Sequence, residues 1–210
     1  MRGFFDNDMS IKLTGCGLLD AACQELGIAE CWLLSSLKPQ LKKSRGKLAQ
    51  YFSTWPADAQ RQIVSFAEQA QPLPPAENQE FIERYLNEHG LDLGELQLLE
   101  AVLRVDNSLL LTGDKRFLKQ LAGTPDLLDM ALEKLPGRLV CLESVLLLLM
   151  DRYGFAFVRN KVLPCKEYDG LIKVAFGIGE SRTEAHAREA LIYELHHLGE
   201  DVARLLHSAE

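Results

Sequence analysis

The chain has 210 residues, of which 47% are hydrophobic and 25% are charged, and its formal net charge at pH 7 is -7. This profile is typical of a globular protein with enough apolar residues for a sizeable core. The acidic balance excludes broad electrostatic adhesion to nucleic acid or to anionic membranes, so any contact with nucleic acid must be local or helped by a metal ion.

The first predicted strand covers residues 3–5 and is followed by two acids, Asp6 and Asp8. A helix is predicted over residues 11–26, because apolar residues recur there at helical spacing and Gly27 ends the pattern. Ligands of open α/β sheets bind at the carboxyl ends of the strands. The acids after this first strand are therefore candidates for a functional site.

A second strand is predicted over residues 31–34, and a basic run over residues 38–47 follows it. We interpret the basic run as a solvated helix face, with a contact for substrate phosphates as the alternative. Residues 46–90 are predicted to be a helical insertion. A proline-rich, extended linker over residues 71–76 divides the helices of this insertion.

The segment 91–95 opens the next predicted helix. Asp92 and Glu95 have the spacing of a capping box, in which two side chains satisfy backbone N–H groups at the start of a helix. Capping is therefore a sufficient structural explanation for Glu95, although an acid in the first turn of a helix can also point into a cleft. Gly94, next to it, would let a backbone or a ligand approach closely.

The stretch 108–117 is an apolar run that ends in an acid and passes directly into a helical pattern. It predicts a short buried strand, a tight turn at Gly113 and a helix that begins near Asp114. Asp114 is thus either the N-cap of that helix or a site residue at the end of a strand. If this strand and the first are neighbours in a parallel sheet, Asp6 and Asp114 converge and repel each other unless a cation neutralises them.

A last strand over residues 138–142 runs into a helix over residues 143–152, so strands and helices alternate as in an α/β fold with a mostly parallel sheet. Beyond Gly154, residues 155–158 and 172–176 are predicted to be strands or buried loops. A final amphipathic helix is predicted to dock on its own domain, with pairing across a homodimer as the alternative. Its apolar stripe consists of Leu191, Leu195, Leu198, Val202 and Leu205.

The five cysteines are odd in number, and no two of them have the CxxC spacing of a zinc or redox site. We expect free thiols in a reducing compartment. The N-terminus has no apolar signal-peptide core, and no apolar run is long enough to cross a bilayer. We therefore expect a cytoplasmic protein without membrane contact.

Carboxylates from separate segments that meet at a sheet edge form an all-oxygen site, which suits Mg²⁺ or Mn²⁺. Such a site can hydrolyse phosphodiesters, because the metal ion lowers the pKa of a bound water and neutralises charge that develops on the phosphate. No nucleophilic side chain is needed. This chemistry is compatible with a chain that has no GxSxG, HExxH or Walker motif.

Three short motifs, at residues 4–8, 91–95 and 110–117, resemble in this order the motifs of the PIN-domain family. The resemblance covers roughly residues 1–152. It implies a three-layer α/β/α sandwich with a mostly parallel central sheet. We accordingly predict a PIN-like domain over residues 1–153 and a C-terminal helical appendage over residues 154–210.

The resemblance implies a metal-dependent ribonuclease, often the toxin of a toxin–antitoxin pair, with RNA as substrate and an antitoxin or another protein as partner. Carried over by position, Asp6, Glu95 and Asp114 would bind Mg²⁺ or Mn²⁺ and carry out catalysis. Asp8 would be an additional acid, and Lys115 would meet the scissile phosphate. A further acid of the family has several candidates by position, which are Glu77, Glu80, Glu83 and Asp92.

Two other functions stay open at this point. The spacing of Asp6 and Asp8 also resembles the Asp-x-Asp opening of haloacid-dehalogenase-like phosphohydrolases, in which Asp6 would be the nucleophile. That family carries another acid a few residues after its last Asp, whereas residues 115–119 contain none, and it has no use for Glu95. The other function is that of an interaction module, a PIN fold that has lost its activity.

Overall fold

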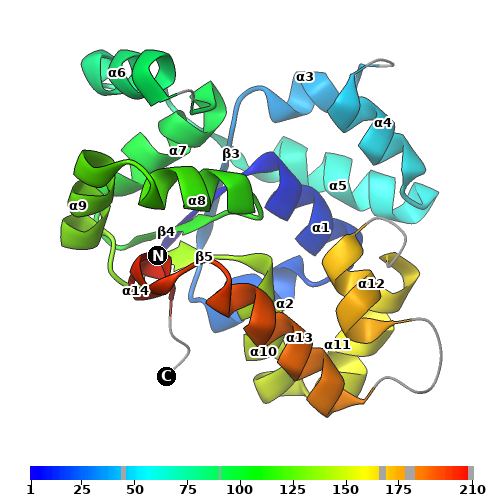
Figure 1. Cartoon of the computed structure of the whole chain (residues 1–210). Helices are drawn as coiled ribbons and strands as arrows, with labels where there is room; N and C mark the ends of the chain where they lie inside the picture. The colour runs from blue at the N-terminus through cyan, green and yellow to red at the C-terminus, as the bar shows by residue number, and fades with distance from the viewer. Residues whose placement is uncertain (44–45, 90, 166–168, 178–182, 208–210) are drawn as a thin grey trace.

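The computed structural model describes residues 1–210 except 44–45, 90, 166–168, 178–182 and 208–210. Its centre is a five-stranded sheet in the order β3-β2-β1-β4-β5, in which every pair of neighbours is parallel (Figure 1). The predicted α/β class with a parallel sheet is confirmed. The strands are β1 (Arg2–Phe5), β2 (Glu30–Leu33), β3 (Gln71–Pro72), β4 (Ser108–Leu111) and β5 (Leu139–Val140).

Four of these strands lie where the sequence predicts them, and β3 lies where it predicts a linker. The backbone there is extended, as expected, but it also pairs with Trp32 and Leu33 of β2. Pro72 has no N–H to donate, and it is tolerated because β3 is an edge strand with one neighbour. The proline-rich stretch therefore forms the edge of the sheet.

Helices connect the strands, and among the described residues none is long and apolar enough to span a membrane. The helices before β4 are α1 (Asn7–Gly15), α2 (Leu19–Glu25), α3 (Leu37–Leu41), α4 (Lys47–Thr54), α5 (Ala57–Gln69), α6 (Gln79–His89) and α7 (Leu93–Arg104). After β4 come α8 (Lys115–Ala122), α9 (Pro125–Lys134), α10 (Leu142–Tyr153), α11 (Phe155–Val162), the short 3₁₀ helix η1 (Leu163–Cys165), α12 (Gly170–Phe176), α13 (Glu184–His196) and α14 (Glu200–Leu205).

Each face of the sheet has its own apolar core, because successive side chains of a strand point to opposite faces. Phe5 and Leu111 belong to a core that includes α1, α2, α5 and α10–α13. Phe4 and Leu110 belong to a second core, which includes α6–α9 and α14 (Figure 1). Helices thus cover both faces of the sheet.

The predicted basic run begins on α3, where Lys38 Nζ donates to the backbone oxygen of Glu68 at 3.4 Å. Lys42 and Lys43 are exposed, as expected for a solvated face. Arg45 lies outside the described residues.

The predicted strands or loops at residues 155–158 and 172–176 are wrong, because these residues lie in α11 and α12. Apolar runs of four or five residues are too short to distinguish the period of a strand from that of a helix. The flanking residues carry the helical signal. Gly154 has a φ of 85° before α11, and the Asp169 side chain caps α12 by accepting from the backbone N–H of Ile172 at 2.9 Å.

The predicted final helix is two helices, α13 and α14, separated at Gly199, whose φ is 90°. The predicted stripe divides between the two cores. Leu191 packs in the first core, whereas Val202 and Leu205 pack in the second. These leucines and the valine are thus buried against the rest of their own chain.

The predicted boundary at residue 154 stays a prediction. Apolar side chains from beyond it, such as Val158 and Phe176, lie in the same core as Phe5 of β1. The C-terminal segment therefore contributes to the interior that supports the first strand.

Candidate functional site

Asp6 follows the last residue of β1 and ties that strand end to the end of β4. One carboxylate oxygen, Oδ1, accepts from the backbone N–H of Met9 at 2.6 Å and so caps α1. The other, Oδ2, accepts from Thr112 Oγ1 at 2.7 Å and from the backbone N–H of Gly113 at 2.9 Å. Asp6 is 8% exposed, and every one of these contacts holds it in place.

Burial, with the nearby charge of Asp8, raises the pKa of Asp6 to about 6. The hydrogen bonds from Met9, Thr112 and Gly113 favour the charged form and oppose this rise. The cost of burial exceeds their combined effect. Asp6 is therefore a buried carboxyl group that a cation would help to ionise.

Asp114 lies at the same edge of the sheet as Asp6, because Phe5 of β1 and Leu111 of β4 are in register. Its backbone N–H donates to Thr112 Oγ1 at 3.1 Å, and the same hydroxyl group donates to Asp6. Asp114 is also the N-cap of α8, since its side chain accepts from the backbone N–H groups of Arg116 and Phe117. Asp114 is thus both the cap of a helix and a residue at the end of a strand, which are the two alternatives that the sequence leaves open.

Glu95 lies in the first turn of α7, and the predicted capping box is confirmed there. The backbone N–H of Asp92 donates to Glu95 Oε2 at 3.2 Å, and the backbone N–H of Gly94 donates to Asp92 Oδ1 at 2.8 Å. The cap also directs Glu95 toward Asp114. The Arg116 guanidinium lies beside both carboxyl groups, 3.7 Å from Glu95 Oε1 and 3.3 Å from Asp114 Oδ2.

Glu95 and Asp114 shift each other's pKa in opposite directions. Burial and the hydrogen bond with Asp114 raise the pKa of Glu95 to about 7. Partial burial acts in the same direction on Asp114, but the backbone N–H of Phe117 and the hydrogen bond from Glu95 together lower its pKa. Glu95 therefore holds its proton to a higher pH than an ordinary glutamate, at a position where carboxyl groups from two elements meet.

Asp8 is held by Lys12, which lies one turn further along α1. Lys12 Nζ is 2.6 Å from Asp8 Oδ2 and 2.5 Å from Asp169 Oδ2, so it joins the start of α1 to the cap of α12. The two carboxylates raise the pKa of Lys12 despite its burial. Burial raises the pKa of Asp8, and the nearby carboxylates of Asp169 and Asp114 add to this effect against the opposing charge of Lys12.

Gly113 is required for space at this edge. A Cβ atom at this position would lie 2.5 Å from Asp8 Oδ2. The sequence predicts a tight turn here, and Gly113 is not among the glycines with positive φ. The absence of a side chain at Gly113 therefore makes room for the close approach of Asp8 and does not serve a left-handed backbone.

Lys115 does not point at the carboxylates of Asp6, Glu95 and Asp114. Its Nζ lies 2.8 Å from Glu143 Oε1 and 2.5 Å from Glu194 Oε2, so it links α8 to α10 and α13. Glu143 is 2% exposed and follows β5 closely. Glu143 is not among the predicted site residues, although it follows a predicted strand as Asp6 and Asp114 do.

The structure brings Asp6 close to Asp114. It also brings Asp114 close to Glu95, which lies in the first turn of α7 beside the N-cap residue Asp92. It does not bring Glu77 to this edge, because Glu77 pairs with Arg104 at the opposite end of α7 from Glu95. Among the described residues, no group of three or more His, Cys, Asp or Glu side chains is arranged to hold a metal ion. The available donors are carboxylate oxygens, which are the ligands that Mg²⁺ and Mn²⁺ prefer.

Comparisons of the chain with models of protein families, with curated proteins and with solved structures gave no match.

Proposed function

We propose that this protein is a metal-dependent ribonuclease of the PIN type, in which Asp6, Glu95 and Asp114 bind Mg²⁺ or Mn²⁺. One observation carries the proposal: the carboxyl groups of Glu95 and Asp114, from different elements, lie together beside the Arg116 guanidinium, and Thr112 links Asp114 to the buried Asp6. Carboxyl groups so close together retain a proton in the absence of a cation, and a divalent ion can take its place.

A bound divalent ion would supply a water of lowered pKa and would neutralise charge on the phosphate. Residues of the chain itself orient the three acids. Thr112 fixes Asp6 and the backbone of Asp114 through one hydroxyl group, and the N–H groups of α8 fix the Asp114 side chain. The capping box fixes Glu95 in the same way. The three acids are therefore held at the ends of strands and helices, and they lose little conformational freedom when a metal ion binds.

Single-stranded RNA is the substrate class that we propose, because its scissile phosphate must reach a group of carboxylates at the end of a sheet. The Arg116 side chain is 71% exposed beside Glu95 and Asp114, which makes it the group most suited to meet an RNA phosphate. Lys115, for which the sequence suggests this role, is engaged by Glu143 and Glu194. The toxin role, the antitoxin partner, the homodimer and the cytoplasmic location stay predictions.

The test is cleavage of a single-stranded RNA by the purified chain with Mn²⁺ or Mg²⁺ and with a chelator. We expect Asp114→Asn to lower the rate by at least about 100-fold, because it removes a charged ligand. Asn retains a capping oxygen, so the helix α8 should persist. Asp126→Asn is the matched control, since the Asp126 side chain contacts Arg84 and Tyr85 of α6 and should leave the rate unchanged.

Equal cleavage by Asp114→Asn and the parent chain would refute the assigned site. Phosphate found covalently on Asp6 by mass spectrometry, after incubation with a phosphomonoester, would favour the phosphohydrolase instead. If the folded chain neither cleaves RNA nor retains phosphate, the interaction module is the remaining function.

A further inference from the structure

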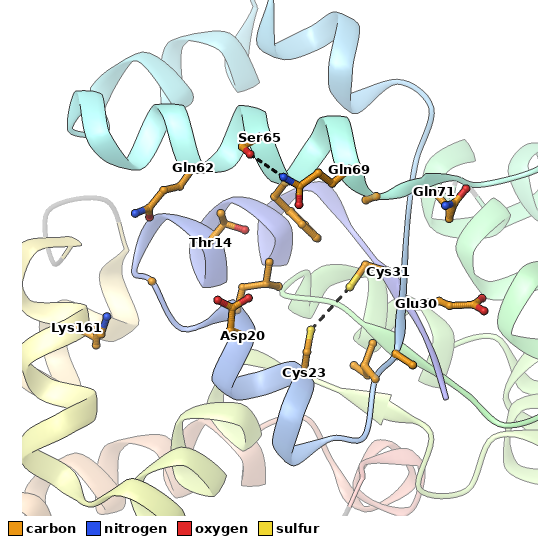
Figure 2. Close-up of a pocket in the computed structure, with 16 residues that line it drawn as sticks. Thr14, Asp20, Cys23, Glu30, Cys31, Gln62, Ser65, Gln69, Gln71 and Lys161 are labelled. Atoms are coloured by element: carbon orange, nitrogen blue, oxygen red, sulfur yellow. Dashed lines mark hydrogen bonds between the residues drawn. The ribbon is translucent and has the colours of Figure 1, made fainter.

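A cavity of about 730 Å³ that includes none of Asp6, Glu95 and Asp114 in its lining lies between α1, α2, β2, α5 and α11 (Figure 2). Its lining includes polar side chains such as Ser65, Gln69 and Lys161. It also includes two cysteines, Cys23 on α2 and Cys31 on β2. The ribonuclease proposal makes no use of this cavity or of its thiols.

The two cysteines of the cavity face each other. Their Sγ atoms are 3.8 Å apart, and Figure 2 shows the two side chains directed toward one another from α2 and β2. Each side chain is only partly buried. The other cysteines are buried, so this pair combines mutual contact with partial exposure.

We propose that Cys23 and Cys31 are a site of reversible oxidation, at which a peroxide converts the two thiols into an intramolecular disulfide. The sulfur atoms must approach by less than 2 Å to reach the bond length of about 2.05 Å. Cys31 lies in a strand paired with Gly3 of β1, so the approach must come chiefly from α2. Gly27, with a φ of 64°, lies in the short connection between the two cysteines and gives it a residue that tolerates unusual backbone angles.

The contact between the thiols also favours their oxidation. The thiolate is the form that reacts with peroxide, and a hydrogen bond from a neighbouring thiol stabilises it. The hydrogen bond from Cys23 lowers the pKa of Cys31, although burial and the charge of Asp20 act against this. Cys31 is therefore the cysteine that we assign to the first step, and Cys23 is the resolving thiol.

The reaction has two steps. The Cys31 thiolate attacks one oxygen of the peroxide, the O–O bond breaks, and the products are a sulfenic acid on Cys31 and a hydroxide that takes a proton to become water. The Cys23 thiolate then attacks Cys31 Sγ, the S–O bond breaks, and the departing hydroxide takes the second proton. One hydrogen peroxide is reduced to two waters while two thiols become one disulfide.

The test treats the whole chain with hydrogen peroxide, removes the peroxide and counts thiols after unfolding. We expect the five free cysteines to fall to three, with a monomeric mass lower by two hydrogen atoms. Non-reducing peptide mapping should locate the link between Cys23 and Cys31, and dithiothreitol should reverse it. These readouts are independent of RNA cleavage, so the result does not depend on the proposed ribonuclease.

Two variants distinguish this site from general thiol oxidation. Cys23→Ser should accumulate a sulfenic acid on Cys31, which a cyclic diketone traps, and should form no link. Cys16→Ser is the matched control, because Cys16 contacts another thiol, Cys165, but is buried. It should form the Cys23–Cys31 link at the parent rate.

The peptide map of the unaltered chain decides the outcome even if a variant fails to fold. A map without the Cys23–Cys31 link, a link between Cys16 and Cys165 formed as fast, or links only between separate chains would each overturn the proposal.

Discussion

The carboxyl groups at the edge of the sheet occupy two environments. Asp6 is buried, and both of its oxygens accept hydrogen bonds that join β1, α1 and the end of β4. Glu95 and Asp114 lie at the rim beside Arg116, where the Asp114 side chain is 34% exposed and the Glu95 side chain is 12% exposed. Two aspartates at one sheet edge therefore differ in how much of the fold depends on them: the Asp6 side chain joins three segments, whereas the Asp114 side chain caps α8.

Among the substitutions at these acids, Asp6→Asn should have the largest effect on activity and on the free energy of unfolding. We expect this change to abolish RNA cleavage and also to lower the free energy of unfolding by about 1–3 kcal/mol, because an amide cannot accept on both sides and leaves a buried N–H group unpaired. Asp114→Asn should cost less than about 1 kcal/mol, since Asn still caps α8. Chemical denaturation of both variants measures this difference, and equal losses would contradict the division into two environments.

The pH dependence of stability tests the raised pKa of Glu95. The pKa of Glu95 in the folded protein is about 7, above its ordinary value of 4.5, so its contribution to stability is complete below about pH 4.5 and is lost as the pH rises through 7. Glu95→Gln should remove this contribution, which we expect to be about 1–2 kcal/mol between pH 5 and pH 8. Denaturation of parent and variant at both pH values measures it.

Asp6 adds a second contribution of the same sign, because its pKa is also raised, from 3.8 to about 6. That contribution should remain in Glu95→Gln and be lost between about pH 4 and pH 6. If the free energy of unfolding that Glu95 and Asp6 contribute rose between pH 5 and pH 8, the account would be contradicted.

The smallest expected effect on stability concerns Arg116. Its guanidinium lies beside both rim carboxyl groups, but the side chain is largely exposed, so Arg116→Ala should change the free energy of unfolding by less than about 1 kcal/mol. Binding of RNA should weaken, because the exposed cation at the site is lost. Lys119→Ala, on the same helix, is a control for the charge change. Equal RNA affinity of Arg116→Ala and the parent would remove Arg116 from the proposed site.

The sequence was sufficient for the parts of the fold that local patterns determine. β1 and β4 are short apolar runs followed by acids, as the sequence predicts. Their parallel pairing, which the sequence leaves as a condition, places Asp6 and Asp114 at one edge. The capping box of Asp92 and Glu95 is likewise a local feature. These elements could be predicted because their signals lie within a few residues of one another.

The remaining features depend on contacts between distant segments. Whether residues 71–72 form a strand is decided by the free edge of β2, and the apolar stripe of α13 and α14 divides between two cores on opposite faces of the sheet. The ion pairs of Lys12 with Asp169 and of Lys115 with Glu194 join residues far apart in the chain. No local period or spacing encodes such partners.

The most direct test of the central claim, that the acids at this edge form one metal site, is a calorimetric titration of the chain with Mn²⁺ at pH 6.5 in two buffers of different ionisation enthalpy. We expect saturable binding with release of protons, because Glu95 is largely protonated below its pKa of about 7. Glu95→Gln should bind more weakly and release fewer protons. The absence of saturable binding at millimolar Mn²⁺, or the same proton release from Glu95→Gln, would contradict the account.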